Sequence, residues 1–230
     1  HCEPGPAPLA VDVMTYDTLR PVPRASLGAD DSTALVVGVC DHGARARAAT
    51  MVRAVSLLAP NHPNLRLTLV GPGSDDEDLR MHAAALGLTK IVTFAGERED
   101  YLAVLRAANL GWVVATGDAA AFACLDFMAM RVPVLAERGP LAGTYVADGI
   151  TGLLMPPTDA PGTAAALARL LAHDDQPVGM GTAGRGLRRV DPVPPLRLHG
   201  VVAQPLPRRG RPQLGPDVVV LGQLVPSGGG

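Results

Sequence analysis

The 230-residue sequence has few aromatic residues and no strong excess of charge of either sign. Phenylalanine, tryptophan and tyrosine make up 3% of the chain, and the formal net charge is -2 at pH 7. Proteins that bind nucleic acid need a positive field for the phosphates and, for single strands, aromatic platforms for the bases. We therefore expect no nucleic-acid partner.

Cysteine and long apolar runs are also scarce. Cys2, Cys40 and Cys124 are far apart, odd in number and without zinc-ligand spacing, so we expect neither a disulfide framework nor a metal site. This usage is typical of a reducing compartment, and we expect the cytoplasm. No apolar run approaches the roughly 18 residues of a membrane span, and no signal peptide is visible, so membrane association is not indicated. The chain opens on His1 rather than Met, which indicates a piece of a longer protein.

From residue 34 onward, short apolar runs alternate with helical patterns. The predicted strands are 34–39, 65–70, 91–94, 110–115, 133–136 and 152–155. The predicted helices are 45–58, 79–86, 100–108, a helix that follows Asp118, and 163–172. This alternation predicts an α/β fold: a Rossmann-like parallel sheet with helices on both faces.

Ligands of such sheets bind beyond the carboxyl ends of the strands. Gly38, Gly71 and Gly73 come at or after the ends of predicted strands, so we expect them to line a binding edge. For Gly71 and Gly73 the alternative is a role as turn formers.

The two ends of the chain differ in composition from its middle. Residues 1–31 are Pro-rich and irregular, and we interpret them as a linker or domain entry. Residues 32–189 form the predicted domain. Residues 190–230 are dense in Pro, Gly and Arg and predict a disordered tail, or an aberrant one produced by a reading-frame slip in a GC-rich gene.

The helix that follows Asp118 carries the sharpest functional signal. It is apolar on nearly every side, which is typical of a buried helix, yet Asp126 sits in its middle. An unpaired buried charge is costly. Either the fold brings a cation to Asp126, such as an arginine, or this face opens onto a cleft where the hydroxyls of a ligand meet it. Asp118 stands at the mouth of the same helix, where helix capping is an alternative to ligand binding.

Five motifs in this order resemble a known family. They are LTLVGPGSDDEDLR (67–80), VTFAGEREDYLAVLRAANL (92–110), MAMRVPVLAE (128–137), VADGITGLLMPPTD (146–159) and MGTAGR (180–185). Their order and spacing are similar to those of the C-terminal, donor-binding half of a family 4 retaining glycosyltransferase with the GT-B fold.

The resemblance implies roles for particular residues. Two glutamates separated by seven residues mark the donor site of the family, and they fall here on Asp118 and Asp126. Asp118 would then be the catalytic residue, near the sugar, and Asp126 would accept hydrogen bonds from the ribose hydroxyls. The backbone N–H groups at the helix start would meet the diphosphate; the residues concerned are Ala120, Ala121 and Phe122.

The sequence also departs from the family pattern. The Arg and Lys that usually hold the diphosphate fall on Val39 and Ala44, and Arg45 lies one position away as a substitute. The resemblance implies a UDP- or GDP-sugar as substrate, no metal, no cofactor, and an N-terminal acceptor domain that this chain lacks.

Three functions remain open from the sequence. The first is a fragment of a retaining transferase that binds a nucleotide sugar and has weak or no activity by itself. The second is a non-catalytic binding or scaffold module with the same fold. The third is a protein similar to a sugar-nucleotide epimerase.

Overall fold

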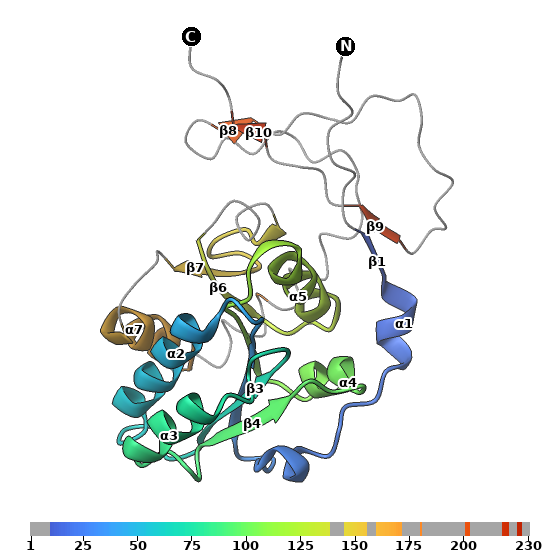
Figure 1. Cartoon of the computed structure of the whole chain (residues 1–230). Coiled ribbons are helices and arrows are strands. Elements are labelled where there is room, and N and C mark those ends of the chain that lie inside the picture. The colour runs from blue at the N-terminus through green and yellow to red at the C-terminus, as the bar shows by residue number, and fades with distance from the viewer. Residues whose placement is uncertain are drawn as a thin grey trace, which may run out of the picture.

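The computed structural model describes residues 10–138, 145–155, 160–171 and 180, together with three short strands near the C-terminus (Figure 1). Its first half contains β1 (Ala10–Asp12), α1 (Val13–Thr18), the 3-10 helix η1 (Arg24–Leu27), β2 (Ala34–Val39), α2 (Arg45–Leu58), β3 (Leu65–Val70), α3 (Glu77–Ala85), β4 (Val92–Gly96) and α4 (Tyr101–Arg106). Its second half contains β5 (Leu110–Val113), α5 (Gly117–Ala129), β6 (Val134–Glu137), β7 (Gly152–Met155), α7 (Ala160–Leu171), β8 (Val201–Val202), β9 (Val218–Val220) and β10 (Val225–Pro226).

Six strands form one parallel sheet in the order β4-β3-β2-β5-β6-β7. The central strands are apolar on both faces, as a parallel sheet covered by helices requires. The chain moves outward from β2 to β3 and β4, then returns to place β5 on the other side of β2. The order therefore reverses between β2 and β5, which is the topological switch point of the sheet.

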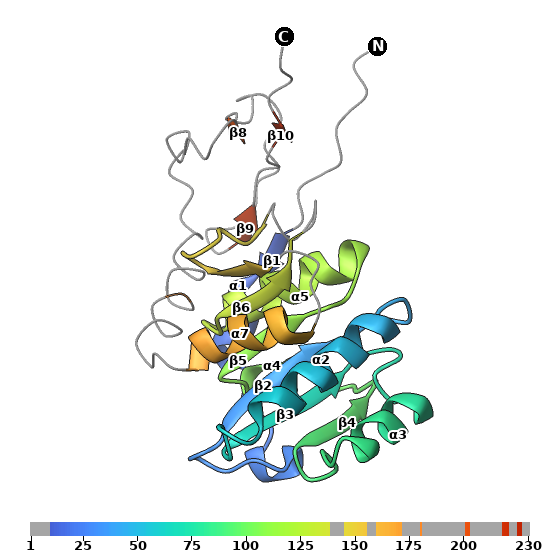
Figure 2. The ribbon, with the colours of Figure 1, turned by 90° about the vertical axis from the view of Figure 1, so that its left-hand side faces the viewer.

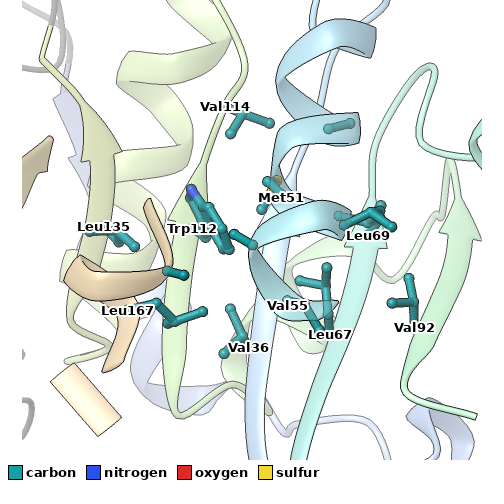
Figure 3. Close-up of a cluster of buried hydrophobic side chains, with 14 of the residues drawn as sticks. Val36, Met51, Val55, Leu67, Leu69, Val92, Trp112, Val114, Leu135 and Leu167 are labelled. Atoms are coloured by element: carbon teal, nitrogen blue, oxygen red, sulfur yellow. The ribbon is translucent and has the colours of Figure 1, made fainter. Parts of the chain in front are cut away.

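Helices cover both faces of the sheet, so the predicted α/β fold is confirmed. In Figure 1, α2, α3 and α7 lie on one side of the sheet and α1, α4 and α5 on the other; Figure 2 views the first of these faces directly. Each face has its own buried apolar cluster. On the first face, Met51 and Val55 of α2 and Leu167 of α7 pack around Trp112 of β5 (Figure 3).

Element boundaries follow the sequence pattern closely where apolar periodicity is strong. Strands β2, β3 and β7 and helix α2 have the predicted bounds. Helix α7 starts at Ala160, three residues before its predicted start. The remaining elements of the sheet differ from the prediction by one or two residues at their ends, where periodicity ceases to be informative.

The stretch predicted to be irregular, residues 1–31, contains β1, α1 and η1 in its described part. Tyr16 of α1 and Leu27 of η1 are buried in the apolar cluster on the α4–α5 face. Arg24 holds η1 in place by donating hydrogen bonds to the carbonyl oxygens of Ala107 (2.8 Å) and Thr33 (2.6 Å). The prolines keep the elements of this stretch short, but they do not prevent its side chains from packing into the apolar cluster.

Two predictions lie largely outside the described residues. Of the tail, residues 190–230, only β8, β9 and β10 are described; β9 pairs with β1 and β8 with β10, both antiparallel. Of the motif at 180–185, only Met180 is described. Among the described residues, no helix combines the length and the apolar character that crossing a membrane demands.

Candidate functional site

The carboxyl ends of β2 and β5 lie side by side at the switch point of the sheet. Beyond Val39 the chain turns toward α2 on one face, and beyond Val113 it turns toward α5 on the other. Neighbouring strands whose connections diverge in this way leave a crevice between their loops, and ligands of open α/β sheets bind there.

Asp41 and Thr116 join the two loops across this crevice. The Asp41 carboxylate accepts hydrogen bonds from the Thr116 backbone N–H (2.5 Å) and hydroxyl (2.6 Å). Burial opposes ionisation of Asp41, but the hydrogen bonds from Thr116 outweigh it and hold the pKa of this carboxyl below its ordinary value. A carboxylate therefore stands charged at the start of α5, where its charge disfavours an approaching anion.

The loops after β2 and β3 touch through their backbones, and glycine makes this possible. Gly71 has φ +104°, and a Cβ at this position would lie 2.4 Å from the Cys40 carbonyl oxygen. Gly73 has φ +78° and packs against the backbone of Asp41 and His42. Both glycines thus lie at the predicted edge, where the turn-forming role proposed as the alternative is evident.

Gly38 differs from these two because it lies inside β2. A Cβ there would come within 2.6 Å of the Met51 side chain and 2.7 Å of the Leu69 side chain. Its missing side chain makes room for α2 to pack on the sheet. The structure therefore gives Gly38 a packing role on the α2 face.

Helix α5 begins at the crevice. Thr116 occupies the N-cap position and Asp118 is exposed in the first turn, so the capping alternative proposed for Asp118 is wrong. The Ala120 N–H already bonds to the Thr116 carbonyl oxygen (3.4 Å). The N–H groups without a carbonyl four residues earlier in the helix are those of residues 117–119. These amides, three residues before the predicted Ala120–Phe122, are the ones that a ligand at the helix start would meet.

The three predicted phosphate-binding residues of α5 differ in exposure. Ala120 and Ala121 are buried, whereas the Phe122 side chain is 42% exposed. Phe122 stands four residues after Asp118 and four before Asp126, so the three side chains follow one another along one side of α5.

Asp126 is buried and bonded to a tyrosine from a distant part of the chain. It is 7% exposed, and its Oδ1 accepts a hydrogen bond of 2.5 Å from the hydroxyl of Tyr16 in α1. Burial raises the pKa of Asp126 to about 6, although the Tyr16 hydrogen bond acts in the opposite direction. In the described part of the chain, no lysine or arginine forms an ion pair with Asp126. The arginine partner considered from the sequence is thus replaced by a phenol.

The arginines nearest the crevice are engaged with acids. Arg45, the substitute phosphate ligand, pairs with Asp78 and lies 3.5 Å from Asp76 at the start of α3. Arg47 lies 3.2 Å from Glu137 after β6 and donates to the Val114 carbonyl oxygen (3.3 Å). Either side chain would have to leave these partners to contact a phosphate.

Two hollows accompany this arrangement, and neither contains Asp118 or Asp126. One, of about 50 Å³, lies beside Trp112 and is bounded by Arg47 and Glu137. A larger one, of about 490 Å³, lies between β7 and α7. Within the described residues, no three His, Cys, Asp or Glu side chains form a group able to hold a metal ion.

Sequence reasoning missed Tyr16 and Asp41. Tyr16 is one of three tyrosines and lies in a Pro-rich stretch that has no sustained period, so only tertiary contacts reveal it. Asp41 had a usable signal, because it follows the first strand of the sheet and therefore lies at the edge where ligands bind.

Comparison with known families gives one consistent match. A family model described as "Glycosyl transferases group 1" matches residues 31–173. Among curated proteins, the chain is similar to the D-inositol 3-phosphate glycosyltransferase of Corynebacterium jeikeium, with 31% identity over 140 residues, which cover 57% of this chain and 33% of that protein. The chain thus spans about a third of the length of the curated relatives it matches.

Solved structures share the fold. The C-terminal domain of a group 1 glycosyl transferase (LpcC) from Francisella tularensis superposes with a TM-score of 0.63 at 15% identity, covering 76% of this chain and 95% of that domain. The Anabaena protein HepE, solved in complex with UDP and glucose, superposes with a TM-score of 0.64 at 20% identity, covering 77% of this chain and 50% of that one.

Proposed function

Because this chain belongs to the family of group 1 glycosyl transferases, we propose that its residues 32–189 form the C-terminal, nucleotide-sugar-binding half of a retaining transferase. The observation that carries the proposal is the position of α5. This helix starts at the switch point of the sheet with Asp118 exposed in its first turn, and it carries Asp126 two turns later.

The start of α5 suits a diphosphate. The N–H groups of residues 117–119 and the positive end of the helix dipole favour a negative group at this point. Asp118 would lie beside the transferred sugar, and Asp126 would accept hydrogen bonds from ribose hydroxyls. In this proposal the donor-binding half acts together with an acceptor-binding domain, because both substrates are oriented only when two domains form the cleft.

The likeness to a separately solved C-terminal domain supports this assignment, since the chain covers 95% of that domain. HepE, a structural neighbour of the same fold, holds UDP and glucose. On this basis we propose UDP-sugars as the first donors to test, and GDP-sugars as the second.

A non-catalytic binding or scaffold module is the second candidate. It is favoured by the electrostatics of the crevice, where Arg45 and Arg47 are paired with acids and Asp41 is itself an anion. A charge-assisted hydrogen bond to phosphate contributes about 1.5–3 kcal/mol, so two engaged arginines predict weak donor binding. The matched family lends no support to the epimerase alternative.

Calorimetric titration with UDP, GDP and UDP-glucose separates the two candidates. We expect the wild type to bind one of them and the Asp126→Ala variant to bind it at least roughly tenfold more weakly, because a hydrogen-bond acceptor for the ligand is lost. Asp31→Ala is the matched control and should bind like the wild type. It changes an exposed aspartate just before the amino end of β2, whereas the proposed site lies beyond the carboxyl end. Silence from both the wild type and Tyr16→Ala, which uncovers Asp126, would favour the scaffold module.

A further inference from the structure

Tyr16 and Asp126 are 110 residues apart in the sequence and meet in a buried contact. Each is 7% exposed, and the distance of 2.5 Å between the phenol oxygen and Oδ1 is typical of a hydrogen bond to a charged carboxylate. Asp126 is the one charged side chain among the buried residues that the structure describes. The contact therefore covers the most deeply placed charge of the described fold.

The surroundings of Asp126 leave the phenol as its described polar partner. The charge of Asp126 also acts on Tyr101 of α4 and Cys124 of α5: burial, and then this charge, raise the pKa of Tyr101, and the same two causes raise the pKa of Cys124 to about 12. Both groups are thus neutral near pH 7 and do not compensate the carboxylate. The Tyr16 hydroxyl donates a hydrogen bond to the carboxylate, and a ligand hydroxyl can take over that role. A ligand hydroxyl could not replace a paired cation in the same way.

A ligand hydroxyl must reach the Asp126 carboxylate to bond to it. With the Tyr16 phenol on Oδ1, Asp126 is only 7% exposed, so a ligand gains access to this carboxylate only when the phenol of α1 moves away. A second ligand hydroxyl could not approach without displacing the ring as well, because Tyr16 belongs to the same apolar cluster as the α5 residues around Asp126.

We propose that α1 is an autoinhibitory element whose Tyr16 hydroxyl occupies the acceptor that the ribose hydroxyls of a sugar nucleotide would use on Asp126. The proposal rests on the donor site proposed above and adds its regulation. Donor binding then requires α1 to withdraw, and the observed affinity is reduced in proportion to the fraction of molecules in which α1 is docked.

Titration of UDP into four proteins tests this inference: wild type, Tyr16→Phe, Tyr16→Ala and Tyr145→Phe. We expect both Tyr16 variants to bind UDP roughly tenfold more tightly than the wild type, which corresponds to nine molecules in ten with α1 docked. Tyr145 is a buried tyrosine that packs against α5 through Ala121 and Leu125, so Tyr145→Phe controls for the loss of a phenol near this helix and should leave the affinity unchanged.

Hydrogen exchange provides a second readout on the wild type. UDP should accelerate the exchange of the backbone amides in 13–18 if α1 withdraws when the ligand binds. Circular dichroism of each variant confirms that a change in affinity does not come from unfolding.

The outcomes distinguish this inference from the donor site itself. Binding by Tyr16→Ala and silence from the wild type would support both. Equal affinity in the wild type and the Tyr16 variants, with unchanged exchange in 13–18, would overturn autoinhibition and leave the donor site standing. Weaker binding by Tyr16→Phe would also overturn it, because Tyr16 would then position Asp126 for the ligand. Silence from all four folded proteins would overturn the donor site and autoinhibition together.

Discussion

Asp126 bears its carboxylate in a part of α5 where the residues on either side along the helix are apolar. Its pKa in the folded protein is about 6, against an ordinary value of 3.8, because burial penalises the charged form. Between these two pH values the folded protein retains a proton that the unfolded chain has lost. The stability contributed by the neutral carboxyl is therefore fully present below about pH 4 and is lost as the pH rises through about 6.

Replacing Asp126 by asparagine should remove this loss. An amide does not titrate, and its oxygen can still accept the Tyr16 hydrogen bond. Relative to the wild type, we expect the free energy of unfolding of Asp126→Asn to rise by on the order of 2–3 kcal/mol between pH 4 and pH 7. Urea denaturation at both pH values measures the difference. A gap between the two proteins that stays constant with pH would show that Asp126 has the same pKa in the folded and the unfolded chain.

At the scale of the element, α5 packs on the sheet through the aromatic ring of Phe127, which lies against Gly111 of β5. A Cβ on Gly111 of β5 would lie 2.4 Å from the ring of Phe127, which is fully buried. The missing side chain allows the helix to approach the strand closely, and the ring fills the space between them. This contact sets the height of α5 above β5 and therefore the position of the helix start beside the crevice.

Truncating this ring should be costly. We expect Phe127→Ala to lower the free energy of unfolding by roughly 3–5 kcal/mol, because it opens a cavity under α5. Phe122→Ala removes the same group from the exposed side of the same helix and should change stability by no more than about 0.5 kcal/mol. Chemical denaturation of the two variants gives both values. Equal losses would contradict the packing described here.

The elements of the sheet could be predicted from the sequence because their apolar patterns are strong and local. Runs such as ALVVGV and LRLTLV are bounded by turn residues, so β2 and β3 have the predicted bounds. The acids of α5 could be identified for the same reason, since a carboxylate in an apolar helical pattern stands out in the sequence alone. Whether they bind a donor stays a prediction.

The partners of these acids could not be predicted in the same way. Tyr16 reaches Asp126 and Asp41 reaches Thr116 only after the sheet has formed, and the sequence separations are 110 and 75 residues. Helix α1 is too short to be stable by itself, and the sequence gives it no apolar period. It is stabilised by the tertiary burial of Tyr16. The sequence consequently suggested a linker where the structure has packed residues.

At the scale of the whole molecule, this packing makes the first 31 residues part of the folded unit. Leu27 is 1% exposed, and its burial alone contributes about 1.5–3 kcal/mol. We expect deletion of residues 1–31 to lower the free energy of unfolding by at least roughly 2 kcal/mol, and Leu27→Ala to account for most of that loss. Leu57→Ala, which changes an exposed leucine, is the control. Unchanged urea midpoints after the deletion would restore the linker predicted from the sequence.

Trp112 is the one tryptophan of the 230 residues, and it lies 1% exposed at the centre of the sheet between α2 and α7 (Figure 3). Tryptophan emission from this chain, excited selectively over its three tyrosines, consequently arises from a single indole. Any red shift of that emission reports the entry of water between α2, α7 and β5, so the molecule carries its own spectroscopic probe without labelling.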